Sequence, residues 1–162
     1  MIRGGSALLI ALAAAGCTDV SSYSNAGDHY EGTLVPGDFV RSGIEGGTRL
    51  CLSLDAARLQ SDPGAISASD GRFGSTPLRP IPQLWHDSLS TLAFGEGRAR
   101  NLVYAVADAA GDDLAIVSLM QGGKVEVRLI RGAPSAASDA GDATANLFAV
   151  FELARTPGPC PF

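Results

Sequence analysis

Asn101-Leu102-Val103-Tyr104-Ala105-Val106 is the first of three strand-like runs that give the clearest fold signal in the chain. It is followed by Leu114 to Met120 and by Val125 to Ile130. The last two runs flank Gln121-Gly122-Gly123-Lys124, whose two glycines can supply the positive φ angles of a type I′ turn. Three consecutive runs joined by short turns predict antiparallel hairpins in the carboxyl-terminal half.

The last of these runs shows which face of the sheet is buried. Val125, Val127 and Leu129 alternate with the charged residues Glu126 and Arg128. This alternation predicts a strand with one face in the core and one in water.

The same signals continue upstream and downstream. Ser90 to Phe94 and the 101–106 run flank Gly95-Glu96-Gly97 and predict another hairpin. Gly95 to Arg100 has only two glycines of a dinucleotide fingerprint and precedes a strand, so it is interpreted as a turn. Further strands are expected at His29 to Val35, at Thr48 to Leu54 and at Leu147 to Leu153. The last is apolar on both faces, which predicts either a central position in the sheet or a position covered on both faces.

The stretch between Ala56 and Asp87 is less regular. We expect a helical turn at Ala56 to Gln60, a short strand around Arg72 to Thr76 and then a proline-rich passage. Together the patterns predict an all-β fold of about seven to nine short strands, arranged as a small antiparallel barrel or a sandwich. Consecutive hairpins favour up-and-down order in the carboxyl-terminal half.

The amino-terminal end has a different character. Arg3 precedes an apolar run from Ala7 to Ala15, and Ala14-Ala15-Gly16-Cys17 closes it. A charged start, a short apolar run and small residues are the layout of a secretory signal, and the run is far below the roughly 20 residues of a membrane span. These residues resemble the lipobox of bacterial lipoprotein precursors, although Ala14 stands where that family most often has Leu.

The resemblance implies cleavage before Cys17, acyl chains on that residue and anchorage in the cell envelope. Thr18 rather than Asp after the cysteine implies the outer membrane more than the inner membrane. The expected organisation is a signal peptide at 1–16, a lipidated tether at 17–27 and a single β domain at 28–162 with a mobile loop at 132–146. The alternative is an ordinary cleaved signal with a cysteine near its end. The domain also has the look of uncharacterised envelope lipoproteins, which implies no activity.

Cysteine use fits an exported protein. With Cys17 acylated, Cys51 and Cys160 remain, and an even remainder in an oxidising compartment suggests one disulfide. Such a bridge would close a loop of about 100 residues and stabilise the fold by up to about 4.7 kcal/mol in the chain-entropy model. The alternative is two free buried thiols.

Charge excludes several partners. The formal net charge is −5 at pH 7, and Lys124 is the only lysine. Nucleic-acid binding needs a clustered basic footprint, which this sequence lacks. Membrane association is therefore expected through the acyl chains on Cys17, with an envelope protein as a second possible partner.

Catalytic signals are thin. His29 is expected to be an exposed residue at a strand start, and His86 lies beside Asp87 and Ser88. Adjacent residues point apart, and triads assemble in space rather than in sequence, so a hydrolase is the least expected class. Acidic turns at 108–113 and 139–142 do not match a calcium loop. We expect no catalytic site, metal or cofactor.

The proline-rich passage from Thr76 to Trp85 is the one stretch that suggests a binding surface. Arg79, Pro80, Trp85 and His86 are the candidate interaction residues, since Trp and Arg are enriched in binding hot spots. The alternative is a crossover loop across a barrel end, with Trp85 and its apolar neighbours plugging the core. The leading hypothesis is a non-enzymatic envelope lipoprotein with a binding domain. The second is a small barrel that carries an apolar ligand.

Overall fold

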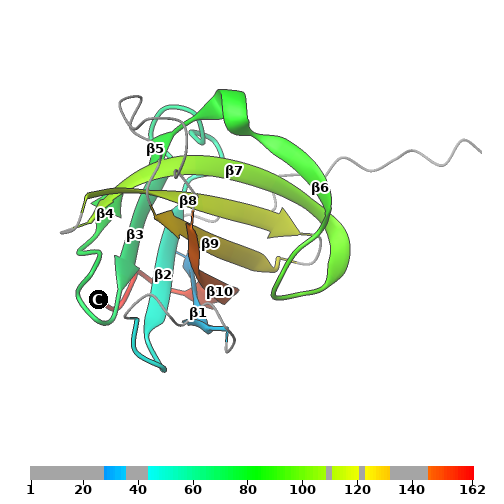
Figure 1. Ribbon diagram of the computed structural model, residues 1–162. Coiled ribbons are helices and arrows are strands. Elements are labelled where there is room, and N and C mark those ends of the chain that lie inside the picture. The colour runs from blue at the N-terminus through cyan, green and yellow to red at the C-terminus, as the bar shows by residue number, and fades with distance from the viewer. Residues whose placement is uncertain (1–27, 36–43, 109–110, 121–122, 132–145) are drawn as a thin grey trace, which may run out of the picture.

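Ten antiparallel strands form one sheet that curls into a nearly closed barrel (Figure 1). The structure, a computed structural model, describes residues 28–35, 44–108, 111–120, 123–131 and 146–162. The strands are β1 (Asp28–Leu34), β2 (Arg49–Leu54), β3 (Gly64–Ala68), β4 (Thr76–Pro77), β5 (Arg79–Pro80), β6 (His86–Ser90), β7 (Glu96–Asp108), β8 (Gly111–Met120), β9 (Val125–Arg131) and β10 (Asn146–Pro157). A short 3-10 helix, η3 (Pro82–Leu84), precedes β6. The expected all-β fold is confirmed.

The order of the strands around the sheet is β4-β3-β2-β1-β10-β9-β8-β7-β5, with β6 also paired to β7. Because β4, β5 and β6 share one place between β3 and β7, the ten strands occupy eight positions around the barrel. Most neighbours in the barrel are neighbours in the chain, so the expected up-and-down order is confirmed. β10 lies between β1 and β9, which confirms the central position predicted for the last strand.

A single residue closes the barrel. β4 and β5 are the two ends of the sheet order, and only Leu78 separates them in the chain. The Leu78 amide donates to the Gly64 carbonyl on β3 (2.9 Å), and the Ile81 amide donates to the Val103 carbonyl on β7 (2.9 Å). The chain thus crosses from one edge of the sheet to the other in one step, and the sandwich alternative is wrong.

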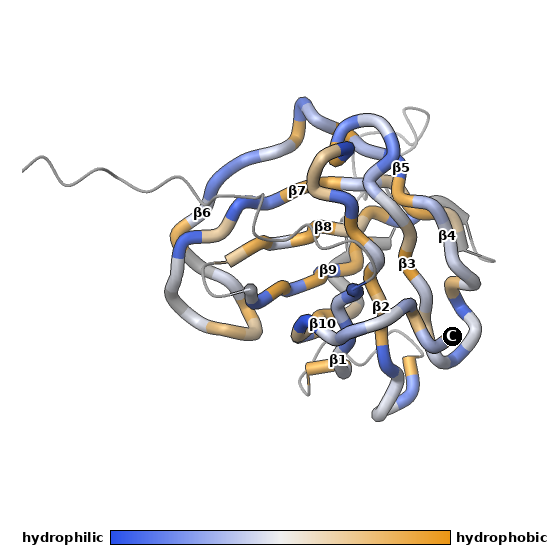
Figure 2. The backbone as a smooth tube through the Cα atoms, turned by 180° about the vertical axis from the view of Figure 1, so that it is seen from behind, coloured by the Kyte–Doolittle hydropathy of each residue, from blue (hydrophilic) through white to orange (hydrophobic). Residues whose placement is uncertain are grey.

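The register places one face of every long strand in the interior. Leu102 on β7 is paired with Val117 on β8, which is paired with Val127 on β9, and all three belong to the core. Hydrophobic and hydrophilic residues alternate along β9 as the sequence predicts (Figure 2). Gly32 also faces inward, and a Cβ there would collide with the backbone of Glu152, so β1 and β10 approach too closely for a side chain.

Side chains fill the interior at these positions. The inward-facing residues of six strands are at most 1% exposed: Leu50, Leu52, Ile66, Leu102, Tyr104, Val106, Ala115, Val117, Leu119, Val125, Val127, Leu129, Ala149, Phe151 and Leu153. An eight-position barrel is just wide enough for its own side chains or for one small ligand. Here the described side chains occupy that space.

Several local predictions differ from the structure. The first strand of the upstream hairpin is β6, so residues 91–95 form the turn and Gly97 belongs to β7. At Ala56 to Gln60, where a helical turn is expected, the chain forms a series of hydrogen-bonded turns, because three backbone bonds within 55–62 each close a single turn. Arg72 to Ser75 is a bend, and the short strand begins at Thr76. The loop at 132–145 and the turn glycine Gly122 lie outside the described residues.

The predicted disulfide between Cys51 and Cys160 is present. It joins the outer face of β2 to the carboxyl-terminal segment that follows β10, with 109 positions between the two cysteines. The tail is thereby tied across the outside of the barrel, beside β3 and β4 (Figures 1 and 2).

Candidate functional site

The four predicted interaction residues all lie on one segment, residues 79–95, which we call the strap. It begins at β5, where the barrel closes, continues through η3 and β6, and ends in the turn before β7. Arg79 and His86 are exposed, and Pro80 and Trp85 are half-buried. The strap therefore contains both anchored and solvent-facing residues.

Trp85 anchors the strap to the barrel. Its indole Nε1 donates to the Val103 carbonyl (3.1 Å), and its ring meets Tyr104 edge-on with 6.0 Å between centroids. It also packs against the hydrophobic core. Trp85 is therefore half-buried against the barrel, whereas Leu84 beside it is 49% exposed.

His86 lies on the outer side of the strap. Its Nδ1 lies 3.0 Å from the Leu84 carbonyl, and its own carbonyl accepts a bond from the Asn101 side-chain amide (3.2 Å). The imidazole thus contacts its own segment, and the backbone of His86 holds β6 to β7.

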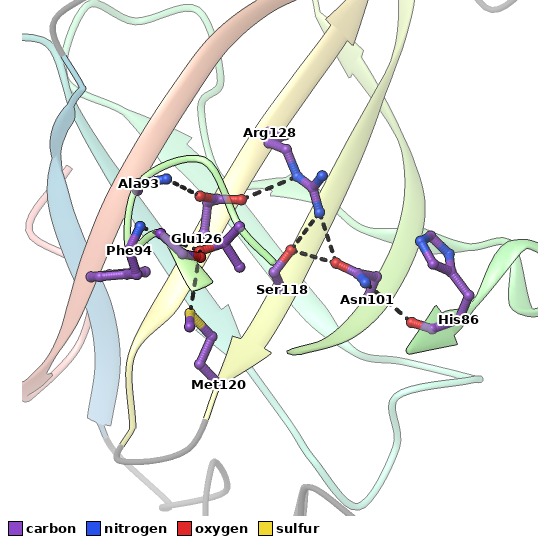
Figure 3. Close-up of polar contacts among 10 residues, drawn as sticks. His86, Ala93, Phe94, Asn101, Ser118, Met120, Glu126 and Arg128 are labelled. Atoms are coloured by element: carbon purple, nitrogen blue, oxygen red, sulfur yellow. Dashed lines mark hydrogen bonds and ion pairs between the residues drawn. The ribbon is translucent and has the colours of Figure 1, made fainter. Parts of the chain in front are cut away.

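The turn of the strap folds back over the outer face of β8 and β9. The Ala93 amide donates to the carboxylate of Glu126, whose side chain is fully buried (Figure 3). The Thr91 hydroxyl contacts the Met120 sulfur at 3.7 Å, and the Lys124 ammonium lies 5.1 Å from the centre of the Phe94 ring. The turn is therefore fixed by one buried carboxylate, by a hydroxyl–sulfur contact and by a cation–π contact.

A polar network continues from Glu126 across the outer face. Arg128 lies 3.2 Å from the Glu126 carboxylate, and its Nη2 donates to Asn101 Oδ1 (2.7 Å) and to Ser118 Oγ (2.8 Å). The Ser118 hydroxyl donates to the same Asn101 oxygen at 2.6 Å. Figure 3 shows these side chains in a row from β9 to β6.

The contacts in this network join β7, β8 and β9 beneath the strap. The one hydroxyl in it, Ser118, is fully buried and touches an amide oxygen and a guanidinium. Neither group can take its proton, because a guanidinium has no acceptor and an amide oxygen is a poor base. The arrangement fixes the strap on the barrel through charge-assisted bonds.

The solvent-facing side of the strap includes three large apolar side chains. Leu84 is 49% exposed, Leu89 is 73% exposed and Leu92 is 51% exposed, and among the described residues these are the exposed large hydrophobic side chains. β6 pairs with β7, which holds the strap beside the barrel wall. Large apolar side chains exposed along one segment are surface that another chain can cover.

Two depressions mark the surface. One, of about 400 Å³, lies between the β2–β3 connection and the strap, and Trp85, Arg100 and Leu102 line it. The other, of about 570 Å³, lies on the outer face of β1, β2 and β3 beside the carboxyl-terminal tail, and His29 and Ser67 are among its lining residues.

His29 corrects one expectation. It was expected to be exposed, yet it is 3% exposed, because the tail covers it. Its Nδ1–H donates to the Gly158 carbonyl (2.6 Å), and its Nε2 lies 3.4 Å from Glu31 Oε2. A residue 129 positions away supplies this cover, and no local pattern in the sequence signals it.

The network around Glu126 was also missed by sequence reasoning. Alternation identified Glu126 and Arg128 as the wet face of a strand, but the strap buries Glu126. The only signal in the sequence for this burial is the length of the β6–β7 hairpin, which is sufficient for its turn to fold over β8 and β9.

Among the described residues, no group of three or more metal-ligating side chains gathers. No helix in the described part of the chain is long and apolar enough to cross a membrane. No protein-family model, curated protein or solved structure matches this chain.

Proposed function

We propose that this chain is a lipid-anchored lipoprotein of the cell envelope, favoured at the outer membrane, whose barrel is a non-enzymatic binding domain. The strap is its contact surface, and the partner is another envelope protein. The observation that carries the proposal is the exposure of Leu84, Leu89 and Leu92 along this one strap.

The packed interior favours this proposal over a carrier of apolar ligands. A carrier of this barrel size needs an interior space of a few hundred Å³. The inward-facing core side chains of β7, β8 and β9 are at most 1% exposed, which supports a filled interior. The strap, in contrast, leaves apolar area in water that a partner would cover.

A site-specific crosslinking experiment tests the strap. A photoreactive side chain at Leu89 is expected to give a discrete adduct with one envelope protein in intact cells. The matched control is the same group at Thr33, which is exposed on the outer face of β1 away from the strap. Equal adducts from both positions, or none from Leu89, would contradict a role of the strap.

A separate substitution tests the anchor. Cys17→Ser removes the thiol that would carry the diacylglycerol, so the protein is expected to leave the membrane fraction. Two or more acyl chains are needed for stable anchorage. Retention of the variant in that fraction, after a high-salt wash that removes peripheral proteins, would contradict lipidation at Cys17.

A further inference from the structure

We propose that the depression beside the carboxyl-terminal tail is a binding site for a short uncharged glycan. This inference goes beyond the proposed contact surface, because it concerns the opposite part of the barrel wall and does not depend on the strap. The groove has a volume of about 570 Å³, within the range of small-molecule sites. Its lining residues are Asp28, His29, Ser53, Ala65, Ser67, Ser75, Pro159, Cys160 and Phe162.

Small outward-facing residues create the space. Ser53 on β2 is paired with Ala65 on β3, and Cys51 is paired with Ser67, so these side chains share the outer face. Larger residues on the same strands, such as Leu52 and Ile66, face the interior. The floor of the groove therefore consists of short side chains. Three of the residues that line the groove are serines.

The tail is a fixed wall of the groove. The disulfide from Cys160 to Cys51 and the bond from His29 to the Gly158 carbonyl hold it at two points. The Arg49 guanidinium lies 5.2 Å from the centre of the Phe162 ring and supports the last residue. Because the tail is already held in place, little conformational entropy is lost when a ligand binds against it.

The opposite rim is also set in place. Ser75 has a left-handed φ of 56°, which is uncommon for a residue other than glycine. Its amide donates to Ser67 Oγ (3.1 Å), which holds this conformation. Strained backbone of this kind concentrates at functional sites.

The acidic side chain that lines the groove, Asp28, and the neighbouring Glu31 are already paired with arginines, which disfavours a cationic ligand. The Asp28 carboxylate accepts bonds from Arg155 at 2.8 and 2.9 Å. Glu31, beside His29, is paired with Arg49 at 2.8 Å. What remains for a ligand is the exposed hydroxyls of Ser53 and Ser75, which both donate and accept, and the aromatic ring of Phe162.

An extended peptide is a poor fit for the same surface. β1 is paired on both edges with β2 and β10, and β2 is paired with β1 and β3. A peptide therefore finds no free strand edge beneath the groove, whereas a sugar can bond to hydroxyls and lay its apolar face on Phe162.

The test is NMR mapping on the whole mature domain with named probes. Chitotriose and maltotriose are titrated separately, with trialanine and inorganic phosphate as comparators. At least one sugar is expected to shift the amide signals of Ser53, Ser67, Ser75 and Phe162. No shift from either sugar at about 10 mM, a concentration that detects even millimolar affinity, would overturn the proposal. Shifts in these signals from phosphate or trialanine alone would also overturn it.

Substitutions then locate the site. Ser53→Trp fills the groove from an exposed position, and it is expected to weaken sugar binding at least tenfold. Thr33→Trp is the matched control, because Thr33 is exposed on the outer face of β1 but does not line the groove. Phe162→Ala removes the aromatic wall and is expected to weaken binding with less effect on the fold. Unchanged affinity in both Ser53→Trp and Phe162→Ala would place the site elsewhere.

Discussion

Tyr104 is the residue whose environment is least expected from the sequence. It faces the interior opposite Ala115, and its buried hydroxyl has no hydrogen-bond partner among the described residues. Burial raises the pKa of this hydroxyl well above its ordinary value. A buried polar group without a partner loses its bonds to water and gains none in return.

Tyr104→Phe is therefore expected to stabilise the domain by about 1 kcal/mol at neutral pH, because it removes the unpaired hydroxyl and keeps the ring. The midpoint of urea denaturation measures the change. A loss of stability of similar size would mean that the hydroxyl has a partner in solution.

The same variant is expected to change the alkaline limb of stability. Above about pH 10 the unfolded tyrosine ionises while the buried one stays protonated, so the wild-type free energy of unfolding falls as pH rises. The contribution is fully present below pH 10 and is lost toward the raised pKa of Tyr104. Tyr104→Phe is expected to lose less stability between about pH 9 and pH 11, with a residual loss from Tyr30, whose pKa burial also raises.

At the scale of elements, the turn between β6 and β7 explains why part of the outer face of β9, which the sequence predicts to be in water, is buried. β9 presents Glu126 and Arg128 outward, as its alternation predicts. The strap then folds over them, and Ala93 donates its amide to the Glu126 carboxylate. A carboxylate buried in this way is stable only while its ion pair and its amide partner stay in place.

Glu126→Ala is expected to destabilise the domain by about 2–3 kcal/mol. The loss is small for a broken buried ion pair, because the Arg128 side chain left without its partner is still partly in water. Amide exchange at Ala93 should rise more than exchange in β2 or β3. Glu152→Ala is the matched control, since Glu152 is paired with Glu126 across β10 and β9 but is exposed. An equal loss in both variants would contradict the assigned role of the turn.

At the scale of the whole molecule, two links join segments from different parts of the structure. Leu78 joins the two ends of the sheet order, and the Cys51–Cys160 disulfide joins the early and last segments. The first closes the barrel through backbone bonds. The second ties the tail over β1 and β2 and buries His29 beneath it.

Replacing both cysteines with serine, in the double variant Cys51→Ser with Cys160→Ser, is expected to cost about 2–5 kcal/mol of stability. Cross-linking two positions 109 residues apart restricts the unfolded chain strongly, and this restriction is lost. Urea denaturation of the variant should match that of the reduced wild type. A variant as stable as the oxidised wild type would contradict a stabilising role for the bridge.

Local patterns were sufficient to predict the strands and their order in the carboxyl-terminal half. The alternation in β9 and the glycine turns specify hairpins without long-range information. Two predicted strands had the wrong bounds: the strand expected at 90–94 is β6, and the strand expected at 72–76 begins only at Thr76. The partners of these strands on β7 and β3 decide where each one starts. The predicted interaction residues proved to share one strap, but the buried network beneath it could not be predicted from spacing.

The sequence by itself determined the all-β class, the alternating faces, the hairpin order and the cysteine pair, since each rests on residues close in the chain or on a simple count. Only the tertiary structure decided that the sheet closes through Leu78, that Glu126 and His29 are buried, and that a groove forms beside the tail. The physical reason is that these features need contacts between segments tens of residues apart. The residues next to Glu126 and His29 in the sequence do not indicate which distant segment will cover these side chains.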